Sequence, residues 1–190
     1  MRIISGFLKG RRLRTPKTDS VRPTEDRVKE ALFNILGSSV MDARVLDLFA
    51  GSGSIGLEFF SRGAAYVHFH DKHPQSLACI RQNLEDLKIV GSTSVTKGDF
   101  RSCIRRLGSA GECFDFIFID PPYGQGIAEE AVQLIWEADL LCEGGRIVIE
   151  TGLDWTLGPC GYLQLDERRY GSTMLRFFGK EASDDSNLPG

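Results

Sequence analysis

The chain has 190 residues, of which 42% are hydrophobic, and its formal net charge is -3. This length and composition are typical of one compact domain with a full hydrophobic core. The apolar stretches are far shorter than the ~20 residues that a membrane-spanning helix needs, and no signal peptide is recognisable. Five scattered cysteines without a C-x-x-C pair predict reduced thiols in a cytoplasmic protein. Membrane-spanning and disulfide-scaffold classes are therefore excluded.

The charge is concentrated at the N-terminus. The first 18 residues contain six cations and no acid, which leaves -9 for the other 172 residues. Such a block favours phosphate binding, although a solubilising basic tail is the alternative. Residues 2–4 and 12–14 alternate in polarity with glycines between them, so residues 1–20 are expected to form a β-hairpin extension. The phosphate-binding candidates are Arg2, Lys9, Arg11, Arg12, Arg14 and Arg22.

A helix is expected after this extension. Pro23 precedes Thr24, a good N-cap, and acids follow in the first turn, where the helix dipole favours them. One apolar face comprises Val28, Leu32, Ile35 and Leu36, and Gly37 ends the run. Most of this helix is predicted to be scaffold.

The next segment predicts a nucleotide-binding turn. An apolar strand at 45–49 leads into the glycine-rich residues 50–56, and a helix then runs to Arg62. Gly51 and Gly53 allow a sharp bend against a ligand, and Gly56 allows the helix to pack closely on its strand. Asp47 lies just before this turn, where a carboxylate would repel a pyrophosphate and attract a cation. This arrangement favours S-adenosylmethionine over NAD.

Two more acids follow predicted strands. Asp71 ends the strand at 66–70, 20 residues after Gly51, and is placed to accept hydrogen bonds from ribose hydroxyls. Asp99 follows the strand around 93–96 and is placed to accept from the adenine amine while Phe100 flanks the ring. The full set of candidate cofactor residues is Asp47, Phe49, Ala50, Gly51, Ser52, Gly53, Gly56, Asp71, Lys72, Gly98, Asp99, Phe100, Asp120 and Arg27.

The most specific motif is the elbow Asp120-Pro121-Pro122-Tyr123, which follows an apolar strand at 114–119. Ligands of open α/β sheets bind beyond the carboxyl ends of the strands. Asp120 and the Pro121 carbonyl are suited to accept the two hydrogens of a planar amine while Tyr123 stacks on its ring. The predicted catalytic residues are therefore Asp120, Pro121, Pro122 and Tyr123.

Taken together, these segments resemble the RsmD family of class I methyltransferases, which act on guanine N2 of bacterial 16S ribosomal RNA. The resemblance covers nearly the whole chain and is carried by residues 2–6, 9–13, 22–34, 47–53 and 120–123. It implies S-adenosylmethionine as cofactor and the small ribosomal subunit as partner of a monomeric enzyme, with the basic residues contacting RNA. Two departures are Asp71, where relatives have Glu, and His73, where an acid is usual. The shorter Asp71 is still expected to reach the ribose.

The family's R-P-T-x-x-R segment also points to Arg27. Its guanidinium is a candidate to hold the methionine carboxylate of the cofactor, but a surface ion pair with Asp26 or Glu30 is equally consistent with the pattern. Glu150, at the end of a predicted strand at 146–150, is a candidate helper acid or a carboxylate with a structural partner.

The rest of the chain predicts a doubly wound α/β sheet. Helices are expected from Pro74, with Leu77, Ile80, Leu84 and Leu87 facing the core, and at 100–107 and 127–138. Segments 162–169 and 172–178 predict a closing hairpin. The resemblance implies the seven-stranded, mostly parallel Rossmann-like sheet of order 3-2-1-4-5-7-6 with one antiparallel strand. Residues 21–180 would form this domain and 181–190 a disordered tail.

Four other interpretations account for less of the sequence. A metal site at His68 and His70 lacks a further spaced ligand. An adenine-N6 methyltransferase would use the same turn and elbow, although Asn is the more usual first residue there. An NAD-dependent oxidoreductase leaves Asp47 and the elbow unexplained. A non-catalytic RNA-binding module would be expected to have lost some of these acids.

Overall fold

The computed structural model describes residues 1–16, 23–122 and 126–180. Their secondary structure alternates between strands and helices along most of the chain. The helices are α1 Pro23–Leu36, the short 3-10 helix η1 Gly37–Val40, α2 Ser54–Ser61, α3 Pro74–Asp86, α4 Phe100–Ser109 and α5 Ile127–Glu137. The strands are β1 Arg44–Asp47, β2 Tyr66–Asp71, β3 Thr93–Lys97, β4 Phe114–Ile119, β5 Leu141–Thr151, β6 Tyr162–Tyr170 and β7 Thr173–Lys180.

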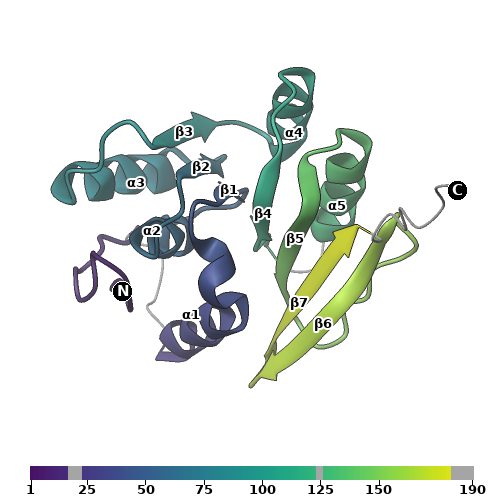
Figure 1. The fold of residues 1–190 in the computed structure, drawn as a ribbon, viewed down its shortest axis with the longest axis horizontal. Helices are drawn as coiled ribbons and strands as arrows, with labels where there is room; N and C mark the ends of the chain where they lie inside the picture. Colours follow the sequence, from purple (N-terminus) through teal and green to yellow (C-terminus); the bar gives the residue numbers. More distant parts are fainter. Residues whose placement is uncertain (17–22, 123–125, 181–190) are drawn as a thin grey trace, which may run out of the picture.

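The seven strands form one sheet in the order β3-β2-β1-β4-β5-β7-β6. Strands β1 to β5 pair in parallel, and β7 runs antiparallel to both of its neighbours. Figure 1 shows the β6–β7 hairpin at one edge of the sheet and the N-terminal segment beside α2 near the other. The predicted strand order and the single antiparallel strand are confirmed.

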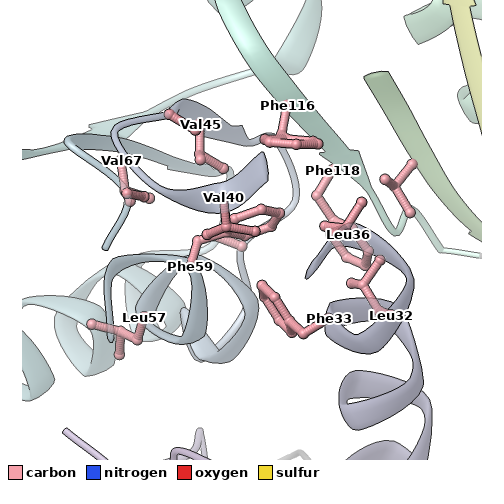
Figure 2. Packing of buried hydrophobic residues seen from close by; sticks show 14 of the residues in the cluster. Leu32, Phe33, Leu36, Val40, Val45, Leu57, Phe59, Val67, Phe116 and Phe118 are labelled. Carbon is pink, nitrogen blue, oxygen red and sulfur yellow. The ribbon is translucent and has the colours of Figure 1, made fainter. Parts of the chain in front are cut away.

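Helices cover both faces of the sheet and create two hydrophobic cores. Alternate residues of each strand point to opposite faces, so in β1 Val45 joins one core and Leu46 the other. The first core lies under α1, α2 and α3, where the Phe33 and Phe59 rings are 4.7 Å apart and Phe59 also packs on Phe116 (Figure 2). The second core lies under α4 and α5. Burial on both faces explains why the central strands read as continuous apolar runs.

The predicted helix faces are also observed. Leu77, Ile80 and Leu84 on α3 and Leu87 directly after it are all at most 9% exposed, as predicted. Helix α1 begins at Pro23, one residue before the expected cap, and ends at Leu36, before Gly37 with φ +55°. Strand β5 begins at Leu141, five residues earlier than predicted, and its pairing with β4 shifts register between Phe114 and Phe116.

The N-terminal extension is seen in part, and one expectation, about the cysteines, needs correction. Within residues 1–16, the expected N-terminal hairpin is present only as an antiparallel bridge between Arg2 and Arg12 with flanking backbone hydrogen bonds from Ile3 to the Arg11 carbonyl and from Leu13 to the Met1 carbonyl, and its remainder lies outside the described residues. Cys113 and Cys142 are joined by a disulfide, whereas all five cysteines were expected to be reduced. The pairing of Phe114 with Leu141 brings these cysteines together, and no local signal in the sequence reveals contacts between residues 29 positions apart.

Some predictions concern parts of the chain that lie outside the described residues, including the disordered tail at 181–190, Arg22 and Tyr123. Within the described ranges, none of the helices combines the length and the apolar character that crossing a bilayer requires.

Candidate active site

The register of the sheet brings the predicted ligand-binding segments to one edge. Asp47 on β1 pairs with Phe69 on β2 and with Phe118 on β4. Three segments therefore lie together at the carboxyl-terminal edge of the sheet. They are the glycine turn after β1, Asp71 at the end of β2 and Asp120 after β4. Parallel strands thus assemble, at their carboxyl ends, segments that lie up to about 70 residues apart in the sequence.

The glycine turn has the backbone conformation that its sequence predicts. Gly51 and Gly53 have φ values of +52° and +77°, and the Gly53 carbonyl accepts the first helical hydrogen bond of α2 from Leu57 at 2.8 Å. A side chain at Gly51 would meet nothing within 4 Å, so this face of the turn is open to a ligand. A Cβ at Gly56 would lie 2.3 Å from the Phe69 ring, which confirms that Gly56 permits close packing of helix on strand.

Two acids hold this turn in place. Asp47 is 1% exposed, and its Oδ2 accepts a hydrogen bond from the Gly56 amide at 3.0 Å. Asp71 accepts from the Gly51 amide at 2.9 Å and from the His73 amide at 2.7 Å. The sequence predicted both acids as cofactor residues but did not reveal that they brace the turn. Their direct contact with the cofactor stays a prediction.

The pKa of Asp47 is raised to about 7, chiefly by burial and to a smaller extent by the charge of nearby Asp71, and the hydrogen bond from the Gly56 amide partly opposes this rise. A negative charge on Asp47 is therefore costly unless a positive group approaches. This electrostatic environment fits a cationic ligand such as S-adenosylmethionine and disfavours a phosphate-bearing one.

The predicted adenine-binding residues lie at the start of α4. Asp99 is the N-cap of this helix and accepts from the Arg101 amide at 2.9 Å, a role that the sequence analysis missed. Phe100 is buried, and its ring lies 5.5 Å from that of Phe49. The side chains of Lys72 and Asp99 are exposed, and their contacts with a cofactor remain predictions.

The two strand histidines are connected by hydrogen bonds through Thr96. His70 Nε2 lies 3.1 Å from the Gly98 carbonyl, an acceptor only, so this nitrogen carries the proton and Nδ1 accepts from Thr96 Oγ1 at 2.9 Å. Thr96 Oγ1 in turn accepts from His68 Nε2 at 2.8 Å. Burial lowers the pKa of both rings, that of His68 to about 4. Through the His70 hydrogen bond to its carbonyl, this row of neutral side chains holds Gly98 in place next to Asp99. Within the described ranges, no three His, Cys, Asp or Glu residues are grouped to hold a metal ion.

The elbow after β4 borders a cavity. Asp120 is exposed, while Pro121 is buried and, with Pro122, lines a cavity of about 430 Å³. The cavity continues over the start of α5 and the segment that follows β5, including Glu150 and Trp155. The structure therefore places Pro121 and Pro122, the residues that follow Asp120, beside a space of a size typical for small-molecule sites.

The N-terminal segment docks on α2 through a buried acid that the sequence analysis missed. Glu58 is fully buried and accepts hydrogen bonds from the Ile4 and Ser5 amides at 2.8 and 2.9 Å. Lys29 Nζ, 3% exposed, lies 3.5 Å from Glu58 and donates to the Arg2 carbonyl and to Ser54 Oγ. A charged residue inside the apolar run of α2 was the available signal.

Asn83 makes a second connection between this segment and the glycine turn. It is 1% exposed, accepts from the Arg14 amide at 2.8 Å and donates to the Ser52 carbonyl at 3.2 Å. Its position between Ile80 and Leu84, on the core face of α3, was the signal that a buried polar role was present. Asn83 thus connects the N-terminal segment to the glycine turn of the candidate cofactor site.

The predicted phosphate-binding side chains within residues 1–16 are exposed. Two of them contact the end of α3: Arg14 Nε lies 2.7 Å from Asp86 Oδ2, and Arg11 donates to the Asp86 carbonyl at 3.1 Å. Arg2 lies 3.9 Å from Asp26. Arg27 is exposed on α1, and the choice between its two predicted roles stays open.

The sheet order, the helices on both faces and the glycine turn define the class I methyltransferase fold. The solved structure of the putative methyltransferase yhhF from Escherichia coli has a TM-score of 0.85 to this chain and 33% identity, covering 96% of this chain and 99% of that one. The putative methyltransferase SMU.776, solved in complex with SAH, shares the fold at 17% identity and a TM-score of 0.68, covering 83% of this chain and 50% of its own.

Residues 1–179 match the family described as Conserved hypothetical protein 95, and the chain belongs to this family. Ribosomal RNA small subunit methyltransferase D of Escherichia coli K12 is 33% identical over 189 residues, which cover 98% of this chain and 93% of that protein. The protein of the same name from Haemophilus influenzae is 34% identical over 179 residues, covering 94% and 93%. The resemblance found in the sequence is confirmed at the level of the family.

Proposed function

We propose that this protein transfers the methyl group of S-adenosylmethionine to the exocyclic N2 amine of a guanine in small-subunit ribosomal RNA. Relatives that match almost the whole chain are named as methyltransferases of this RNA. The proposal goes beyond these names in two respects: the methylated atom is N2 of guanine, and the nucleotide is guanine 966, both by resemblance to the family.

The observation that carries the proposal is the sheet register. Asp47 pairs with Phe118, so the open glycine turn after β1 and the elbow at Asp120 lie on adjacent strand ends. A donor held at the turn would face an amine held at the elbow. Holding both reactants in this way replaces a bimolecular encounter by an oriented one, which is the main catalytic contribution available here.

The residues of the elbow fit the chemistry of a nucleobase amine. Such an amine is a poor nucleophile because its lone pair is delocalised into the ring. Asp120 and the Pro121 carbonyl would each accept one amine hydrogen and so direct the lone pair toward the electrophilic methyl group that S-adenosylmethionine supplies. The amine becomes acidic only after alkylation, so Asp120 acts as an orienting acceptor. Tyr123 would stack on the base.

Replacement of Asp120 by Ala tests this role. We expect turnover to be abolished while S-adenosylmethionine affinity is nearly unchanged, because the residue holds the substrate amine. Methyl transfer is measured with labelled cofactor, and the product nucleoside is identified by mass mapping of 16S RNA. Asp139→Ala, at an exposed site that pairs with Lys180, is the matched control. Retained turnover in Asp120→Ala would exclude the proposed role.

The N-terminal segment is proposed to contact RNA phosphates. We expect Arg11→Ala combined with Arg12→Ala to weaken RNA binding and to make its salt dependence shallower, by about 0.7 to 0.9 in slope for each phosphate that the two arginines neutralise. Cofactor affinity should not change. Binding is measured at several salt concentrations, with the exposed pair Arg168→Ala and Arg169→Ala on β6 as control. An unchanged salt slope would contradict RNA binding by this segment.

The competing functions differ in their products. An adenine-N6 methyltransferase would yield N6-methyladenosine in the same mass map, and a non-catalytic RNA-binding module would yield no modified nucleoside. The methyltransferase relatives and the buried Asp47 disfavour an NAD-dependent oxidoreductase. Equilibrium binding of S-adenosylmethionine and of NAD distinguishes a methyltransferase from such an oxidoreductase.

A further inference from the structure

The elbow by itself does not select a base, because guanine, adenine and cytosine all carry an exocyclic amine. The adjacent ring nitrogen distinguishes them. In guanine this nitrogen, N1, carries a hydrogen, whereas in adenine and cytosine the corresponding nitrogen presents a lone pair. A group beside the elbow that only accepts hydrogen bonds would therefore favour guanine.

Glu150 is placed to be that group. Strands β4 and β5 are parallel, and Ile119, the last residue of β4, pairs with Ile149, so Glu150 on β5 lies beside the point where the chain leaves β4 at Asp120. Adjacent strands are about 4.8 Å apart, so Glu150 and the start of the elbow are neighbours at this edge of the sheet. Glu150 also lines the cavity that Pro121 and Pro122 border.

The rest of the cavity fits a nucleobase better than a phosphate. Its described lining includes the acidic residues Glu129, Glu150 and Asp154 and no Lys, Arg or His. A phosphate would be repelled there, whereas the hydrogen-bond donors of a base edge would be accepted. Proline and tryptophan side chains supply flat apolar surfaces for a ring.

One wall of the cavity is held in place from behind. Arg176 is 5% exposed, donates to the Gly152 and Leu153 carbonyls at 3.3 Å and bonds Thr151 Oγ1. Its guanidinium also lies 5.4 Å from the centre of the Trp155 ring. The segment that follows Glu150 is thus fixed by several contacts, as a binding wall requires.

We propose that Glu150 accepts the N1 hydrogen of the target guanine in this cavity and thereby selects guanine over bases whose ring nitrogen has a lone pair. This inference rests on the proposed function and adds its specificity-determining residue. The carboxylate selects the base and takes no part in the methyl transfer itself.

The decisive probe is 2-aminopurine, which keeps the amine at C2 but has a lone pair at N1. Small subunits are rebuilt with 16S RNA carrying guanine or 2-aminopurine at the methylated position, and kcat/KM is measured for each. We expect the wild type to prefer guanine by at least about 10-fold, the value of a hydrogen bond to a charged group. Glu150→Ala should reduce this ratio by about 10-fold or more.

Glu150→Gln covers the case in which the Ala variant does not fold. The Gln amide can accept the N1 hydrogen of guanine through its carbonyl or donate an N–H to the N1 lone pair of 2-aminopurine. It should therefore also lower the ratio of kcat/KM for guanine to kcat/KM for 2-aminopurine. Glu137→Gln, an exposed glutamate at the opposite end of α5 and outside the cavity lining, is the matched control and should keep the wild-type ratio of kcat/KM values. Thermal unfolding and S-adenosylmethionine binding confirm that each variant is intact.

The outcomes separate the two proposals. Equal turnover of both bases by the wild type, or an unchanged ratio in the folded Glu150 variant, overturns the role of Glu150 and leaves guanine methylation intact. Absence of methyl transfer to guanine by the wild type overturns the proposed function, and this inference with it. The role of Glu150 is supported if the wild type prefers guanine to 2-aminopurine and this preference becomes smaller only in the Glu150 variants.

Discussion

Replacing Asp47 by Asn should change how the stability of the protein without cofactor depends on pH. The carboxyl is buried, and its pKa rises from 3.8 to about 7. Between these two values the folded protein binds more protons at this site than the unfolded chain does. The free energy of unfolding contributed by Asp47 therefore falls as pH rises through this window and levels off above pH 7.

The magnitude follows from the two pKa values. The slope is close to 1.4 kcal/mol per pH unit in the middle of the window, so the Asp47 contribution should fall by about 2 kcal/mol between pH 5 and pH 7. Between pH 7 and pH 8 the further loss should be only a few tenths of a kcal/mol. Asn keeps an oxygen that accepts from the Gly56 amide but does not ionise.

Urea unfolding of both proteins at pH 5, 6, 7 and 8 measures this difference. The comparison with the variant is needed because His68 and His70 have lowered pKa values, and their contribution to stability rises with pH over part of the same range. We expect the wild type to lose about 2 kcal/mol relative to Asp47→Asn from pH 5 to pH 7. Parallel stability curves over that range would refute the assignment of a buried, mostly neutral Asp47.

Two further predictions concern the packing around the glycine turn. Glu58→Gln should lower the free energy of unfolding by about 3 to 5 kcal/mol and speed proteolysis of residues 1–16, because Lys29 would lose its buried charged partner. The control is Glu85→Gln, at an exposed position on α3. Equal urea midpoints for the two variants would contradict the role of Glu58. Gly56→Ala should cost about 1 to 3 kcal/mol, since the added Cβ would lie 2.3 Å from the Phe69 ring. For the second change the control is Gly158→Ala, which meets nothing within 4 Å, and similar melting temperatures for both variants would argue against the close approach.

The sequence by itself determined the elements that depend on local pattern. The apolar run at 114–119 and the core face of α3 were predicted correctly because alternation and helical spacing are local properties. The positive φ values of Gly51 and Gly53 follow from residue type in the same way. The strand order came from resemblance to a family, since periodicity does not specify which strands are neighbours.

Only the tertiary structure decided which side chains meet. The roles of Glu58 and Asn83, the disulfide between Cys113 and Cys142, and the adjacency of Asp120 and Glu150 all join residues that lie between 29 and 69 positions apart. The bracing of the glycine turn by Asp47 and Asp71 depends equally on strand register. Hydrogen bonds and burial across the sheet are set by the packing of the whole domain, so no local segment of sequence encodes them.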